Sequence, residues 1–165
     1  MTDAEAPDAA GETRDATGDG DAEARRAGRF LALFLAGLSP WVVLAFPGQT
    51  DVFFAWGWIN LEGLRVVTLY EYLFEFTRGP RALPRRIQAW PIATLLYAGA
   101  LASALAGVLF GREDRRVTAG LAVFAMLSLI QFAAGFARPS VTPLPVGVVA
   151  VLVVLWWFDG DLLGL

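Results

Sequence analysis

The sequence predicts an all-α integral membrane protein, a bundle of five transmembrane helices with a disordered acidic N-terminal tail. Three observations predict this class. Of 165 residues, 56% are hydrophobic. Two apolar stretches, 87–110 and 117–137, are each long enough to cross a hydrocarbon core of about 30 Å at about 1.5 Å per helical residue. A charged hexapeptide, residues 111–116, joins them, and this arrangement is typical of a transmembrane helical hairpin.

Residues 1–28 are predicted to be a disordered, solubilising tail that is not cleaved. They contain eight acidic residues, three arginines and no Val, Leu, Ile or aromatic residue. Such a segment cannot bury enough apolar surface to offset the entropy of ordering. The alternative is that the acidic residues dock a basic partner. The transmembrane domain is then expected over residues 29–165.

The first span is expected from Phe30 to Phe46, with Pro40 kinking the helix near the bilayer centre. Three arginines between residues 25 and 29 precede it, so the positive-inside rule places the N-terminus in the cytoplasm and the chain in the cell membrane as a multipass protein. The next segment, 52–60, is rich in Trp and Phe. Because these rings favour the headgroup layer, the segment is expected to lie along the outer membrane surface.

Residues 61–77 decide between five spans and four. Their apolar residues fall on one helical face, whereas Glu71 and Glu75 lie one turn apart on a second, partly acidic stripe. Insertion is marginal, because the apolar side chains gain roughly 2.4 to 4.8 kcal/mol and one central carboxylate costs roughly 2.5 to 3.5 kcal/mol. If the segment spans, eight arginines face the cytoplasm and four face outward, which favours five spans. The alternative is four spans plus an interfacial amphipathic helix.

The remaining spans are expected over 87–110, 117–137 and 141–158, with two aspartates at 159 and 161 ending the last. In the first of these, Gly99, Ser103 and Gly107 recur every four residues and form a small-residue seam of the kind that lets membrane helices approach closely. The seam could pack within the chain or at an oligomer interface. Gln131 in the next span is expected to hydrogen-bond across helices.

The composition excludes most catalytic chemistry. The chain has no cysteine and no histidine, and all 13 basic residues are arginine. Thiol nucleophiles, Cys/His zinc sites, imidazole catalysis and lysine Schiff bases are therefore excluded. No cofactor is expected, and no nucleic-acid partner is expected because arginine count alone does not make a binding surface.

The functional prediction is a non-enzymatic membrane protein that contacts the lipid bilayer and packs with itself or with a larger membrane protein. The alternative is a small ion- or proton-coupled transporter component. In that case Glu71 and Glu75 lie at membrane depth, where ionisable residues are rare and usually have a function. Because two carboxylates one turn apart repel each other, at least one of their pKa values should rise.

Several short motifs resemble a known family. They are Ala89-Trp90-Pro91, Leu96-Tyr97, ALASA at 100–104 and EDRRVTAGL at 113–121. Over residues 29–158 the chain is similar to an uncharacterised family of small multipass membrane proteins of haloarchaea. The resemblance implies membrane location and carries no activity, cofactor or catalytic residue. It also implies an association with an envelope protease system, and hence an accessory role in quality control.

Overall fold

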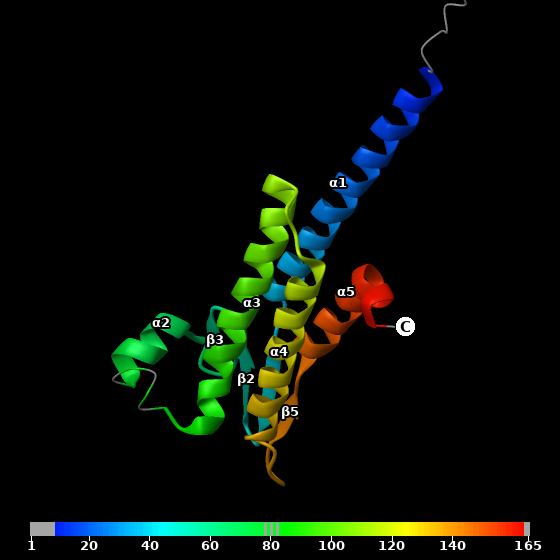
Figure 1. Ribbon diagram of the computed structural model, residues 1–165. Coiled ribbons are helices and arrows are strands. Elements are labelled where there is room, and N and C mark those ends of the chain that lie inside the picture. The colour runs from blue at the N-terminus through cyan, green and yellow to red at the C-terminus, as the bar shows by residue number, and fades with distance from the viewer. Residues whose placement is uncertain (1–8, 78, 80, 82, 164–165) are drawn as a thin grey trace, which may run out of the picture.

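The computed structural model describes residues 9–163 except 78, 80 and 82, and it combines helices with an antiparallel sheet (Figure 1). The five-span all-α prediction is therefore wrong. The elements are α1 (Ala9–Leu38), β1 (Val42–Phe46), β2 (Gln49–Phe53), β3 (Gly57–Asn60), β4 (Arg65–Thr68), α2 (Leu69–Glu71), the π-helical turn η1 (Tyr72–Phe76), α3 (Arg85–Phe110), α4 (Arg115–Ala134), β5 (Thr142–Leu144) and α5 (Val146–Leu163).

The N-terminal helix is longer than the sequence predicted. Helix α1 begins at Ala9, inside the stretch expected to be a disordered tail. Alanine, glutamate and arginine favour helix, and each added residue extends an existing helix without a new nucleation cost. The tail prediction is thus corrected over residues 9–28, and residues 1–8 lie outside the described part of the chain. The N-terminal end of α1 projects beyond the other helices (Figure 1).

The predicted first span, Phe30–Phe46, is half helix and half strand. Helix α1 stops at Leu38, Pro40 follows, and the chain continues as strand β1. Proline lacks the N–H that a continuing helix needs, and its ring clashes with the preceding turn. Here that effect ends the helix instead of kinking it.

The five strands form one sheet in the order β4-β3-β2-β1-β5, with antiparallel neighbours throughout. Pro47 and Gly48 connect β1 to β2, and Gly48 has a φ of 84°. Proline followed by a residue with positive φ is the combination that a type II turn requires. The aromatic segment 52–60, expected along the membrane surface, instead supplies parts of β2 and β3.

Residues 61–77 form neither a membrane span nor an amphipathic helix. Strand β4 pairs with β3, placing Val67 opposite Trp58. Only Leu69–Phe76 is helical, as one turn of α2 followed by η1. Cross-strand pairing of β-branched and aromatic side chains stabilises sheets, and it prevails over the helical spacing of the apolar residues in this segment.

Helices α3 and α4 confirm that this part of the chain forms a helical hairpin. Among the described residues they are the two helices long and apolar enough to cross a membrane by length and composition. They run side by side and antiparallel (Figure 1). The last predicted span, 141–158, is divided between strand β5 and helix α5.

The core lies where the sheet meets α3 and α4. The ring of Phe53 on β2 makes edge contacts with Trp90 of α3 and Phe132 of α4, at centroid distances of 5.1 and 5.0 Å. Further along α3, Tyr97 contacts Trp41 at 5.3 Å, and its hydroxyl donates a hydrogen bond to the backbone of α1 at 2.6 Å. One continuous core therefore joins α1, the sheet and the α3–α4 hairpin.

Candidate functional site

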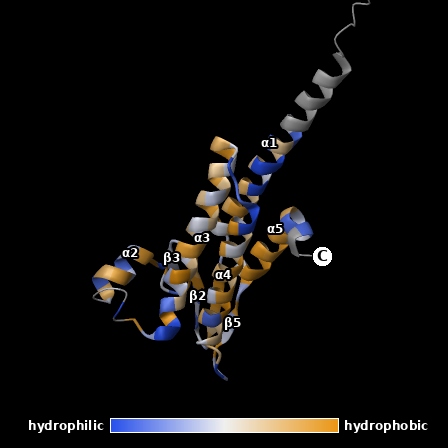
Figure 2. Ribbon diagram, in the orientation of Figure 1, coloured by the Kyte–Doolittle hydropathy of each residue, from blue (hydrophilic) through white to orange (hydrophobic). Residues whose placement is uncertain are grey.

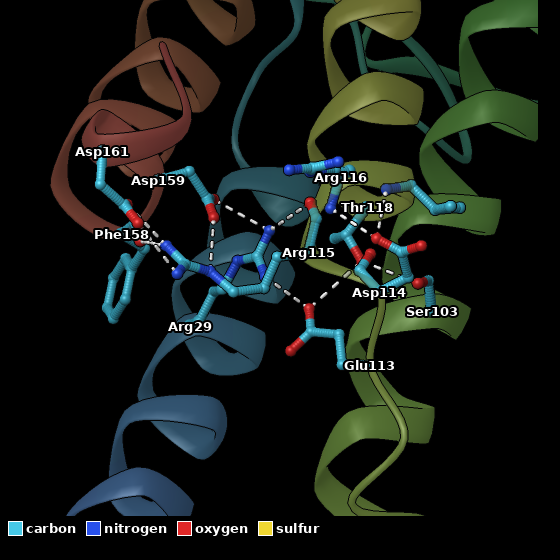
Figure 3. A network of polar contacts seen from close by, with 11 residues as sticks. Arg29, Ser103, Glu113, Asp114, Arg115, Arg116, Thr118, Phe158, Asp159 and Asp161 are labelled. Atoms are coloured by element: carbon cyan, nitrogen blue, oxygen red, sulfur yellow. Dashed lines mark hydrogen bonds and ion pairs between the residues drawn. The ribbon is translucent and has the colours of Figure 1, made fainter. Parts of the chain in front are cut away.

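Four charged side chains meet where α1, the α3–α4 turn, α4 and α5 come together (Figure 3). We call Arg29, Glu113, Arg115 and Asp159 the charge cluster. Arg29 Nη1 donates to Glu113 Oε1 at 2.5 Å, and its Nη2 lies 2.9 Å from Asp159 Oδ2. Arg115 Nε donates to Asp159 Oδ1 at 3.3 Å. Each carboxylate therefore has an arginine partner, and Asp159 lies between two.

Burial sets the energetic importance of the charge cluster. Asp159 is 0% exposed and Arg29 is 3% exposed. Removing such groups from water costs several kcal/mol for each ion, at order of magnitude, and only good pairing offsets that cost. The cluster consequently ties the middle of α1 to the α3–α4 turn, the start of α4 and the last turns of α5, since separating them would break a buried ion pair.

The outer edge of the charge cluster is a two-pronged ion pair. Arg115 donates from Nη1 and Nη2 to the two carboxylate oxygens of Asp161, at 3.1 and 2.8 Å. Such paired hydrogen bonds match the planar geometry of a guanidinium to a carboxylate. They hold the pKa of the Asp161 carboxyl below its usual value. Arg115 also donates to the Phe158 carbonyl at 2.6 Å, which fixes the end of α5.

The inner edge of the charge cluster is a pair of hydroxyls between α3 and α4. Thr118 is fully buried, and its Oγ1 lies 2.7 Å from Ser103 Oγ and 3.2 Å from Glu113 Oε1. A buried polar group needs a partner to avoid its desolvation cost. The hydroxyl pair thus connects the predicted small-residue seam to the cluster.

The local sequence of the α3–α4 turn fixes the position of Glu113 in the charge cluster. Gly111 ends α3 with a φ of 66°, a left-handed conformation that glycine adopts without strain. Asp114 caps α4 by accepting from the backbone N–H groups of Arg116 and Val117. Glu113 lies between Gly111 and Asp114 in the sequence, and its Cβ packs against Gly107 of α3.

A cleft of about 200 Å³ opens beside the charge cluster. Its lining is dominated by arginine and consists of Ala22, Arg25, Arg26, Arg29, Glu113, Arg115 and Phe158. Arg25 also lines a neighbouring open cleft together with Trp156 and Trp157. In this region the Nε of Arg29 is buried and has no hydrogen-bond partner.

The structure places the two predicted glutamates away from the charge cluster. Glu71 accepts from the Thr68 N–H at 2.8 Å and from the Thr68 hydroxyl at 2.9 Å, closing a capping box at the start of α2. These hydrogen bonds lower the pKa of Glu71, whereas repulsion between two carboxylates would raise it. Glu75 is exposed on η1. The suggestion that the pair carries protons or ions stays a prediction.

The small-residue seam faces α4 of the same chain. A Cβ added at Gly99 would touch Leu121, Ser103 is bonded to Thr118, and Gly107 meets Glu113. Of the two alternatives left open by the sequence, these contacts favour packing within the chain. Gln131 lies at an exposed position near the end of α4.

Sequence reasoning missed the charge cluster itself. Arg29 and Asp159 were interpreted as flanks of apolar runs, and the acids of the hexapeptide as a solvated loop. The available signal was that charged residues flank three different apolar runs. Pairing them requires knowing that these charges lie at the same end of the fold, which the five-span topology denied.

Comparison with known proteins gives one match. A family described as a domain of unknown function, DUF8050, matches residues 10–163. The chain belongs to this family. The DUF8050 match confirms the predicted membership of an uncharacterised family and extends beyond residues 29–158 at both ends, so that it includes α1 from its second residue and both Asp159 and Asp161. No curated protein and no solved structure matches.

Proposed function

We propose that this DUF8050 chain is a non-enzymatic accessory protein of the cell membrane, inserted through its α3–α4 hairpin. The observation that carries the proposal is the apolar outer surface of the helices. Large apolar side chains are exposed on four helices: Leu31, Leu35 and Leu38 on α1, Leu95 and Leu109 on α3, Phe124, Leu127 and Ile130 on α4, and Val149, Leu152 and Val153 on α5. Figure 2 shows the hydrophobic colour over most of α3, α4 and α5, whereas α1 is blue where its charged residues lie.

The exposure of α3 and α4 favours membrane helices over the core helices of a soluble protein. Only 28% of the most apolar window of α3 and 44% of that of α4 are buried inside the fold. A soluble protein would bury most of such a helix, because large contiguous apolar patches are rare on soluble monomers. The exposed faces of α1 and α5 extend the same surface, so lipid is the occupant that we propose for it.

The length of α3 between its aromatic and charged ends fits a bilayer. Trp90 lies in the aromatic core near the start of α3, and Gly111 ends the helix beside the charge cluster. The helical rise between them is roughly 30 Å, which is the thickness of a hydrocarbon core. The charged residues of the α3–α4 turn stand at one end of this length, where a membrane interface would lie, whereas Trp90 at the other end is fully buried in the core.

The way in which the polar groups are paired supports the proposed accessory role. The carboxylates of Glu113 and Asp159 are held by arginines, and the Thr118 hydroxyl is bonded to Ser103. A general base or nucleophile has to reach a substrate, and these groups are engaged with one another. We propose that the protein acts through contacts with itself or with a larger membrane protein. The resemblance stated above suggests that this partner belongs to an envelope protease system and that the protein is haloarchaeal.

Membrane fractionation tests the proposal. The wild-type chain should stay with membranes after washing with carbonate at high pH and with high salt, and detergent should release it. Leu127→Arg places a charge on the exposed face of α4, at an expected insertion cost of about 2.5 to 3.5 kcal/mol, and should lower the membrane-bound fraction. Ser140→Arg, at an exposed position after α4, is the matched control and should behave as wild type. Release of the wild-type chain by carbonate alone would refute membrane insertion.

Cysteine labelling tests which parts of the chain lie on the same side of the membrane. Because Arg29 pairs with Glu113, the middle of α1 and the α3–α4 turn lie at the same level of the fold, whereas five spans would separate them. Asp21→Cys and Arg112→Cys should therefore react alike with an impermeant maleimide, and Arg138→Cys, beyond the end of α4, should react oppositely. With the cytoplasmic N-terminus that we propose, only position 138 should label in intact cells. Opposite labelling of positions 21 and 112 would contradict this arrangement.

A further inference from the structure

We propose that the arginine-lined cleft beside the charge cluster binds the phosphate headgroup of an anionic membrane lipid. The inference rests on the proposed membrane insertion and adds a ligand class to it. The cleft has a volume of about 200 Å³ and takes four of its lining side chains from arginine, at positions 25, 26, 29 and 115. A guanidinium presents several N–H donors in a planar fork that fits phosphate oxygens.

The acidic groups near the cleft are already engaged. Glu113 is bonded to Arg29, and Asp161 to Arg115. In contrast, no carboxylate among the described side chains lies within 4.0 Å of the guanidinium of Arg25 or Arg26. The lining therefore carries positive charge that its own carboxylates do not neutralise, and an anion would complement it.

A buried donor at the cleft points to a missing acceptor. Arg29 is 3% exposed; its Nη1 donates to Glu113, and its Nη2 donates to the Arg115 carbonyl at 3.5 Å and lies 2.9 Å from Asp159 Oδ2, whereas its Nε has no hydrogen-bond partner. Buried N–H groups without an acceptor are rare because they lose the hydrogen bond they made with water. A phosphate oxygen seated in the cleft would supply that acceptor.

The surroundings of the cleft favour a lipid over a soluble phosphate. Arg25 also lines the adjoining cleft with Trp156 and Trp157, whose rings are exposed at the end of the apolar part of α5. Exposed tryptophans mark the headgroup layer, and basic pockets between helices at that level bind anionic headgroups. The acyl chains would then follow the exposed apolar side chains of α5.

The test uses the full chain reconstituted in phosphatidylcholine bilayers, with brominated lipids as quenchers of tryptophan fluorescence. Brominated phosphatidylglycerol should reach half-maximal quenching at a mole fraction at least tenfold lower than brominated phosphatidylcholine. The double variant Arg25→Gln/Arg26→Gln should lose this preference. The double variant Arg112→Gln/Arg116→Gln removes the same charge from exposed positions outside the cleft and should keep it.

Three results would overturn the inference. They are equal quenching by both lipids, equal loss of preference in both double variants, and full displacement of phosphatidylglycerol by millimolar inorganic phosphate, which would identify a soluble phosphate as the ligand. Reconstitution reports separately on the proposed function. A chain that enters phosphatidylcholine bilayers without preferring phosphatidylglycerol refutes the lipid site alone, and a chain that enters no bilayer refutes membrane insertion itself.

Discussion

Asp159→Ala should lower the free energy of unfolding by about 3 to 5 kcal/mol, the range expected when one partner of a buried ion pair is removed. The side chain is completely buried and is paired with both Arg29 and Arg115. Without it, Arg29 keeps only Glu113 as an acidic partner while remaining out of water. Unfolding followed by circular dichroism in detergent would measure the change.

Asp161→Ala is the control for this measurement. Asp161 lies two residues further along α5 and also pairs with Arg115, but its side chain is 61% exposed. Water replaces the lost contact at such a site, so the change should leave stability nearly unaltered. If the two variants unfold alike, the charge cluster does not hold the helices together.

Gly107→Ala should destabilise the protein by about 1 to 3 kcal/mol, the cost expected for overpacking a closely packed site. A Cβ at this position would lie 2.5 Å from the Cβ of Glu113, a separation that side-chain rotation cannot relieve because a Cβ is fixed by the backbone. The α3–α4 turn would have to move, and Glu113 would be displaced from Arg29.

Gly120→Ala should stabilise the protein, in contrast to Gly107→Ala. Gly120 lies within α4, and an added Cβ there meets no atom within 4 Å. Alanine is favoured over glycine in a helix by roughly 0.5 to 1 kcal/mol, so this variant should unfold at a slightly higher temperature than wild type. Equal effects of the two substitutions would show that the contact at Gly107 is not tight.

The α3–α4 hairpin could be predicted because its signals agree. Each helix is a long apolar run, and a left-handed Gly111 and the helix cap Asp114 lie within the charged hexapeptide between them. Length alone distinguishes such helices from strands, since a run of more than 20 apolar residues greatly exceeds a typical strand.

The sheet could not be predicted from the same reasoning. Residues 42–46 are a short apolar run, and periodicity cannot separate a buried strand from a buried helix of that length. Joined to the apolar end of α1, they gave an apparent membrane-length segment. Pro40 was the available warning, because it marks the residue at which a helix more often ends than bends.

The charge cluster could not be predicted from the sequence for a second reason. The charged residues Arg29, Glu113 and Asp159 could each be located from the sequence beside an apolar run. Their convergence depends on the direction in which each helix runs, and that direction changed because the chain between Trp41 and Thr68 forms strands where the prediction had part of one span and most of another. One error in counting spans therefore placed Arg29 and Glu113 on opposite sides of the membrane.

The pairing of Arg29 with partners at positions 113 and 159 imposes an order on synthesis. The arginine leaves the ribosome long before either carboxylate exists, so the first helix cannot settle into its final environment until the hairpin follows. Asp159 is the acid that both arginines share, and it lies on the last described helix, α5. The charge cluster therefore cannot close until α5 has been synthesised, although the helices that carry the two arginines are complete long before.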